Sequence, residues 1–157
     1  MSDMPSLLAA LVDGGVDFVL IGGMAGVAHG SSRVTVDIDV VYGRSPANIE
    51  RLAAALAPLA PTLRGAPPGL PFTFNAATIR AGLNFTLQTI LGPIDLLGEA
   101  VGGGTWDALA PQSTIIEVFG RPCRVVSLAQ LIALKRAAGR PKDLEAIAEL
   151  ESLHRGA

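Results

Sequence analysis

The sequence predicts a mixed α/β (α+β) protein with one mixed sheet, helices packed on one face of that sheet, and a helical C-terminal segment. Three patterns predict this class. Helical and strand-like segments alternate over residues 4–59, strand-like segments follow one another over 83–126, and two helical segments end the chain. We therefore expect one domain over residues 1–157, with a sheet-containing core at 1–126 and a C-terminal helical pair at 127–157.

The elements of the first half are bounded by glycine, proline and capping residues. They are a helix at 4–12, a buried strand at 16–21, a short helix at 22–28, a strand at 36–42 and a helix at 47–59. The next segment, residues 61–71, is too rich in proline and glycine to be regular. It is therefore expected to be a loop.

The second half is predicted to complete the sheet before the chain becomes helical. Its elements are a short helical piece at 75–79, strands at 83–90 and 94–98, a hairpin over 113–127, and helices at 127–138 and 141–154. The strand at 83–90 alternates apolar and polar residues, as a half-buried strand does. Gly102–Gly104 make a flexible joint before the hairpin.

Composition narrows the classes of function. Half of the 157 residues are apolar and 17% are charged, which is typical of a globular protein with a core. A single cysteine excludes an internal disulfide and a multi-cysteine zinc site, so a metal would depend on carboxylates. The net charge of −2 provides no global attraction to nucleic acid.

No apolar run approaches the roughly 18 residues of a membrane span. The start of the chain also carries acids where a secretory signal carries bases. We therefore expect a cytoplasmic protein without a membrane partner.

Two aspartates, Asp37 and Asp39, interrupt the strand-like segment VDIDVVY. Residues two apart in a strand share a face, at a spacing of about 6.6 Å, while Val36, Ile38 and Val40 are expected to face the core. Adjacent like charges are unfavourable, and a divalent cation such as Mg²⁺ or Mn²⁺ removes that repulsion. The alternative is a strand whose solvent-facing side is acidic.

A glycine pair, Gly22-Gly23, stands where the first strand enters a helix. Backbone amides at such a point bind anions, and the missing side chains let a phosphate come close. The alternative is an ordinary turn.

Taken together, Ile21-Gly22-Gly23 and Asp37-Ile38-Asp39-Val40 resemble the signature of the nucleotidyltransferase superfamily, the fold of DNA polymerase beta, kanamycin nucleotidyltransferase and the minimal nucleotidyltransferases. The longer segment AHGSSRVTVDIDVV is most similar to the AbiEii-type nucleotidyltransferase toxins, with Arg33, Thr35, Asp37 and Asp39 at the matching positions. The resemblance implies a nucleotidyltransferase fold.

The resemblance also implies a third carboxylate on a neighbouring strand. Asp95, the sole acid in the strand-like segment GPIDLLG, meets this requirement, and Glu99 is a second candidate. The alternative for Asp95 is an acid that accepts a hydrogen bond at a turn. Gly23 stands where the superfamily often has serine, a departure that the AbiEii-type relatives share.

The C-terminal helices contain the remaining candidates. Lys135 continues the apolar stripe of Leu128, Leu131 and Ile132, so it either extends to solvent or reaches a polar pocket such as a bound triphosphate. The segment resembles an AbiEii-type Lys…Arg-x-x-Lys-Asp stretch, matched by Lys135, Arg140, Lys142 and Asp143. Arg136, Arg140 and Lys142 form a basic cluster that either contacts phosphates or RNA or is solvated surface.

These features predict a metal-dependent nucleotidyltransferase that moves a nucleoside monophosphate from an NTP to a hydroxyl of an RNA (tRNA-like) or protein acceptor. The resemblance also implies a possible role as a toxin with an antitoxin partner. Asp37, Asp39 and Asp95 would hold Mg²⁺ or Mn²⁺, and Asp95 would also help to deprotonate the acceptor. The residues expected to bind the nucleotide phosphates are Gly22, Gly23, Arg33, Thr35, Lys135 and Arg140, with Lys142 and Asp143 as additional positions. One alternative is a catalytically silent nucleotide-binding or partner-binding module, and another is an α/β domain with acids on its surface.

Overall fold

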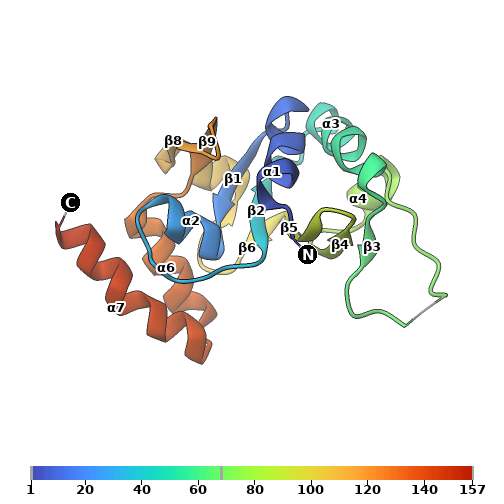
Figure 1. Cartoon of the computed structure of the whole chain (residues 1–157). Coiled ribbons are helices and arrows are strands. Elements are labelled where there is room, and N and C mark those ends of the chain that lie inside the picture. Colours follow the sequence, from blue (N-terminus) through green and yellow to red (C-terminus); the bar gives the residue numbers. More distant parts are fainter. Residues whose placement is uncertain (1, 68, 157) are drawn as a thin grey trace.

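The computed structural model describes residues 2–67 and 69–156, and it confirms the predicted mixed α/β class (Figure 1). The helices are α1 (Met4–Asp13), α2 (Gly22–Ala28), α3 (Pro46–Leu56), α4 (Ala76–Ala81), α5 (Trp106–Leu109), α6 (Leu128–Ala138) and α7 (Pro141–Gly156). The strands are β1 (Phe18–Ile21), β2 (Ile38–Tyr42), β3 (Thr62–Leu63), β4 (Phe85–Thr89), β5 (Gly92–Leu97), β6 (Glu99–Ala100), β7 (Gly104–Thr105), β8 (Thr114–Val118) and β9 (Arg121–Val125).

A seven-stranded mixed sheet forms the centre of the molecule, in the order β3-β4-β5-β2-β1-β9-β8. β1 pairs antiparallel with β2 and parallel with β9, and β2 pairs parallel with β5. All four residues of β1 are buried, so this central strand is covered on both faces. The register places Asp39 opposite both Ile21 of β1 and Asp95 of β5. Three segments far apart in sequence therefore meet at one point.

The helices form two groups around the sheet. α1 contacts α3, and α3 contacts α4, along the upper side of Figure 1. α2 contacts α6, and α6 packs against α7, the last helix of the chain. No helix in the described ranges is long and apolar enough to cross a membrane.

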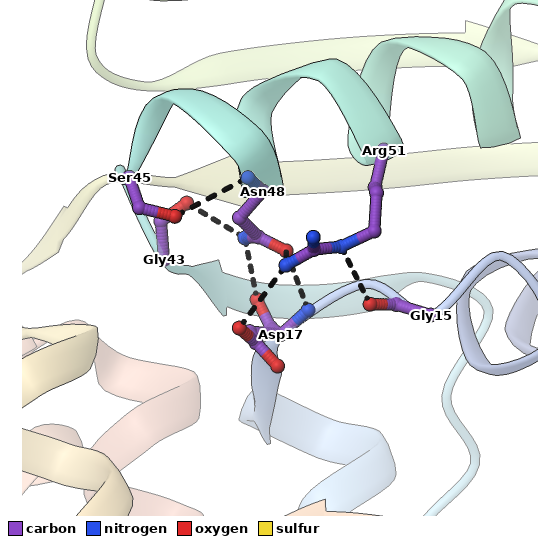
Figure 2. A network of polar contacts seen from close by, with 6 residues as sticks. All are labelled: Gly15, Asp17, Gly43, Ser45, Asn48 and Arg51. Atoms are coloured by element: carbon purple, nitrogen blue, oxygen red, sulfur yellow. Dashed lines mark hydrogen bonds and ion pairs between the residues drawn. The ribbon is translucent and has the colours of Figure 1, made fainter.

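A buried asparagine fixes α3 to the ends of β1 and β2 (Figure 2). The Asn48 amide nitrogen donates to the carbonyls of Asp17 (3.0 Å) and Gly43 (2.7 Å), and its oxygen accepts from the Asp17 amide at 2.7 Å. The Asn48 side chain is fully buried, and both of its polar atoms are hydrogen-bonded. Ser45 caps α3 by accepting from the backbone N–H of Asn48 at 3.2 Å.

The expectation that β2 begins at Val36 with its side chain in the core is wrong. The strand begins at Ile38, and the side chain of Val36 is 60% exposed. The reason lies in β1, which turns into α2 at Gly22. The last residue pair between the two strands is Ile21 with Asp39, and the chain preceding Ile38 has no strand partner there.

The expectation of an entirely irregular segment over residues 61–71 is also wrong. Thr62 and Leu63 form the short strand β3, which pairs antiparallel with β4. These residues precede the proline- and glycine-rich part, and β4 offers them an unpaired edge. The pairing places Arg64 at the end of β3, where its backbone N–H donates to the carbonyl of Thr86 at 2.9 Å.

Candidate active site

Three carboxylates converge at the edge of the sheet. Asp37, Asp39 and Asp95 each place one oxygen within 4.8 Å of the others. Asp39 and Asp95 are direct partners in the parallel β2–β5 pair, and Asp37 immediately precedes β2. All three side chains are partly buried. Hard oxygen donors at this spacing suit a divalent cation such as Mg²⁺ or Mn²⁺.

The electrostatics of this cluster are unfavourable without a cation. Burial first, and then the negative charges of Asp95 and Asp37, raise the pKa of Asp39 to about 7, while the charge of Lys135 opposes the shift. A carboxylate with such a pKa is partly protonated near neutral pH. A bound cation would favour its charged form. The cluster therefore fits a metal on donor type, spacing and charge.

Gly22 and Gly23 occupy positions where a side chain has no room. Gly22 has φ +69°, and a Cβ there would collide with the Asp39 carboxylate. A Cβ on Gly23 would lie 2.7 Å from Oγ1 of Thr35. In the described part of α2 no side chain caps the first turn, so its leading N–H groups have no such partner. The glycines therefore let backbone amides and carboxylates share a very small space.

Eleven of the sequence candidates line one cleft of about 460 Å³ between the sheet edge and the C-terminal helices. They are Gly22, Gly23, Arg33, Thr35, Asp37, Asp39, Asp95, Lys135, Arg140, Lys142 and Asp143. The volume is within the range of about 300–1,000 Å³ typical of small-molecule sites.

Asp143 is fully buried and pairs with two basic side chains of the cleft, Lys135 and Arg140. It accepts hydrogen bonds from Arg140 Nε at 2.6 Å and Nη2 at 3.1 Å, and Lys135 Nζ lies 3.5 Å from its Oδ1. Burial alone would raise the pKa of Asp143, but the hydrogen bonds and charge of Arg140, with the charge of Lys135, hold the pKa below its usual value. The side chain of Lys135 is 16% exposed. Asp143 is therefore placed to orient Lys135 and Arg140.

A model of the nucleotidyl transferase AbiEii toxin family, a type IV TA system, matches residues 6–144. The chain belongs to this family. The match confirms the resemblance seen in the motifs. No curated protein matches the chain.

Solved structures agree with this AbiEii-family assignment at the level of the fold. A crystal structure of ANT(2″)-Ia in complex with adenylyl-2″-tobramycin is similar with a TM-score of 0.59 at 18% identity, over 98% of this chain and 93% of that one. A solution structure of the antibiotic-resistance factor ANT(2″)-Ia gives 0.55 at 16% identity, over 96% and 79%. A protein from Thermotoga maritima described as a nucleotidyltransferase gives 0.52 at 14% identity, over 97% and 88%. At these identities the likeness shows a shared nucleotidyltransferase fold.

Two candidates lie apart from the site of this AbiEii-family chain. Glu99 is exposed in β6 and does not belong to the cluster of Asp37, Asp39 and Asp95. Arg136 pairs with Glu151 at 2.9 Å and does not line the cleft, so the predicted basic cluster is divided. Arg136 is one residue from Lys135 on α6, and this step of about 100° turns it to another side of the helix.

Arg64 is a site residue that the sequence did not indicate. It forms an ion pair with Oδ1 of Asp95, and its Nη1 donates to the carbonyl of Leu87 at 2.9 Å. Because β4 separates β3 from β5, Arg64 approaches Asp95 from the side opposite Asp39. It can therefore orient Asp95 without occupying the space among the carboxylates. The residue lies in a segment interpreted as loop, and no local pattern marks it.

Glu149 is a second residue that sequence reasoning missed. It accepts hydrogen bonds from the hydroxyls of Ser31 at 2.6 Å and Ser32 at 2.9 Å. Glu149 thereby fastens the loop between α2 and β2 to α7, and this loop contains Arg33, Thr35 and Asp37. No short-range pattern could have indicated a contact across more than a hundred residues.

Proposed function

We propose that this chain transfers a nucleoside monophosphate from an NTP to a hydroxyl of an acceptor and releases pyrophosphate. The observation that carries the proposal is the convergence of three carboxylates, the Gly22-Gly23 backbone and Lys135 in one cleft. Membership of a nucleotidyltransferase family supports it independently.

Asp37, Asp39 and Asp95 would hold Mg²⁺ or Mn²⁺. Such ions, when bound, neutralise the triphosphate and stabilise the attacking and leaving oxygens of an in-line displacement. Asp95 lies on the outer side of the cluster, towards β4, and would accept the proton of the acceptor hydroxyl. Arg64 pairs with Oδ1 of Asp95 and would orient this carboxylate for that role.

The nucleotide phosphates would lie against the start of α2 and the basic side chains of the cleft. The N–H groups of Gly22 and Gly23 can donate to phosphate oxygens, because no side chain separates them from a ligand. Lys135 and Arg140, both oriented by Asp143, would neutralise the charge that develops on the leaving pyrophosphate. Arg33, Thr35 and Lys142 line the same cleft and would complete the phosphate contacts.

The acceptor proposed for this activity is an RNA (tRNA-like) or a protein. The family description, a toxin of a type IV TA system, supports a toxin whose target is a cellular macromolecule and which has an antitoxin partner. The adenylyl-2″-tobramycin bound to ANT(2″)-Ia adds an aminoglycoside to the acceptors worth testing.

The decisive experiment incubates the purified chain with Mg²⁺ or Mn²⁺ and each of four α-labelled NTPs. Total RNA, cell protein or tobramycin is supplied as acceptor, and an Asp37→Ala/Asp39→Ala variant runs in parallel. Label on RNA or protein with the wild type alone supports the proposal and identifies the nucleotide. Label on tobramycin instead would contradict the macromolecular acceptor. Metal-dependent NTP binding without transfer would favour the alternative of a silent nucleotide-binding module.

The toxin role has a separate test in cells. Overexpression should stop growth, and the Asp37→Ala variant at equal protein level should not. Normal growth with abundant wild-type protein would contradict the toxin role and leave the transferase activity to the labelling assay.

A further inference from the structure

The loop between α2 and β2, residues 29–37, brings Asp37 to the acidic cluster although it has little structure of its own (Figure 1). Within the described ranges, residues 32–36 form no backbone-to-backbone hydrogen bond. The side chains of Val34 and Val36 are 93% and 60% exposed, so the core does not anchor this stretch either. A loop with so few backbone and core contacts opens locally at a low cost in free energy. The position of Asp37 therefore depends on contacts made through side chains.

One carboxylate on α7, that of Glu149, provides most of these contacts. The hydroxyl of Ser31 donates to its Oε1 at 2.6 Å, and the hydroxyl and backbone N–H of Ser32 donate to its Oε2 at 2.9 and 3.1 Å. Ser31 Oγ also accepts from the backbone N–H of Arg33 at 3.1 Å, which extends the contact along the loop. The hydrogen bonds from the two serines lower the pKa of Glu149 and keep it ionised at neutral pH. Hydrogen bonds to an ionised acceptor belong to the stronger class.

The other side-chain contacts between this stretch and the rest of the chain are longer and exposed. Arg33 lies 3.7 Å from Glu145, and the two side chains are 46% and 70% exposed. The hydroxyl of Ser2 donates to the carbonyl of Val36 at 3.3 Å. Exposed ion pairs of this kind contribute little to stability. Glu149 is therefore the main support of the loop.

The packing of α7 gives Glu149 a fixed position. Ile147 and Leu150, which flank it in the sequence, are buried, and α7 packs against α6. Leu150 also lies close to α2, because a Cβ on Gly26 would be 3.7 Å from its Cδ2. The carboxylate of Glu149 thus extends from a packed helix to a loop that ends at Asp37.

We propose that Glu149 is a positioning residue: through its contacts with the two serines it holds the loop so that Asp37 remains in the acidic cluster. This inference rests on the proposed function, because the role it assigns is to prepare the metal site for a cation. Without these contacts, a cation must order the loop as it binds, and that cost lowers its apparent affinity. Order in the loop and cation affinity are therefore coupled, and each strengthens the other.

The test measures Mn²⁺ binding to the full chain, which requires no turnover. Free Mn²⁺ is followed by electron paramagnetic resonance during a titration, and circular dichroism controls for folding. Glu149→Ala should weaken Mn²⁺ binding about tenfold, and Glu149→Gln, which keeps an acceptor for the serines, should recover part of this loss. In the metal-free chain, hydrogen exchange of residues 31–37 should be faster in Glu149→Ala than in the wild type.

A double substitution at the other side of the contact gives a second route to the same loss. Ser31→Ala/Ser32→Ala should also weaken Mn²⁺ binding. Adding Glu149→Ala to it should cost less than Glu149→Ala costs alone, because the substitutions remove one shared contact. Fully additive losses would show that Glu149 does not act through the serines.

Glu151→Ala is the matched control, because Glu151 lies on the same helix, pairs with Arg136 at 2.9 Å and does not line the cleft. Its Mn²⁺ affinity should equal that of the wild type. Unchanged affinity in Glu149→Ala, or an equal loss in Glu151→Ala, would overturn the positioning role while the proposed function stands. A wild type that binds no Mn²⁺ would overturn both.

Discussion

The two ends of the β1–β2 pair differ in how their polar side chains are partnered. At the end preceding β1, Asn48 is fully buried and satisfies three backbone groups at 2.7–3.0 Å (Figure 2). At the other end, Asp39 is held beside Asp95 and Asp37, and its pKa is raised by burial and by their charges. The same pair of strands thus contains a satisfied network and a repulsive one.

The difference separates polar residues that stabilise the fold from those proposed to act in chemistry. A buried group with all its partners stabilises the native state, whereas clustered carboxylates destabilise it until a cation is bound. We therefore expect substitutions at the Asn48 end to change stability, and substitutions at the acidic end to change activity.

Asp39→Asn should abolish transfer, with a loss of about 10³-fold or more, because it removes a carboxylate from the candidate metal site. The measurement is single-turnover transfer of label from an α-labelled NTP at saturating Mg²⁺. Circular dichroism serves as the folding control. A variant that keeps more than a tenth of wild-type activity would exclude Asp39 from the reaction.

Asn48→Ala should destabilise the protein by about 3 kcal/mol, because three backbone groups lose their partner in a buried place. Urea denaturation measures this change. Transfer activity per folded molecule, assayed well below the unfolding transition, should stay near that of the wild type. A loss of activity with unchanged stability would reverse the contrast between the two ends.

The stability of the metal-free protein should depend on Asp39 ionisation. The pKa of Asp39 is raised from 3.8 to about 7 in the folded chain, so the folded state holds a proton that the unfolded state has lost. Stability therefore falls as pH rises through this window, by roughly 1.4 kcal/mol per unit at most.

Asp39→Asn has no such proton, so its unfolding free energy relative to the wild type should rise from pH 5 to pH 7 and then level off. Saturating Mg²⁺ should reduce the difference, because the cation stabilises the ionised wild type. A difference that stays constant across this range without metal would contradict the shifted pKa.

Arg64→Ala should weaken Mg²⁺ or Mn²⁺ binding about 10- to 100-fold, because the partner that orients a ligand carboxylate is lost. Metal titration of the full chain measures this without any need for activity. Arg64→Lys should recover part of the affinity, since it restores the charge but not the paired geometry. Tighter metal binding in Arg64→Ala would show that Arg64 competes with the cation.

Arg80→Gln is the control for Arg64, because the Arg80 pair with Glu50 is exposed and outside the cleft. Its metal affinity should equal that of the wild type.

Arg51→Gln should have the smallest effect, below about 1 kcal/mol in unfolding free energy. Arg51 lies at the edge of the Asn48 network, and its ion pair with Asp17 at 3.4 Å is half exposed on both sides. Urea denaturation alongside Asn48→Ala gives the comparison. Equal losses in the two variants would mean that burial does not separate them.

Local patterns predicted the parts of the fold that depend on neighbouring residues. The capping residues that bound the helices and the alternation in β4 are set by spacing within a few residues, and the structure shows both. The predicted start of β2 at Val36 and the predicted loop in place of β3 are wrong, because both features depend on where a distant strand offers an edge. Arg64 and Glu149 were not predicted as site residues because each acts through a partner that is distant in the sequence, Asp95 and Ser31 respectively.

The sequence alone determined the mixed α/β class, the AbiEii resemblance, and a list of acids, glycines and basic residues worth testing. These follow from residue type and from spacing over a few residues, both of which can be read from the sequence without the fold. The pairing of β2 with β5 makes Asp39 and Asp95 direct neighbours, and the folded backbone leaves Gly22 no room for a side chain beside Asp39. Asp143 likewise joins Lys135 and Arg140 in one buried network. Such contacts depend on strand register and helix packing, which bring together residues that are distant in the chain.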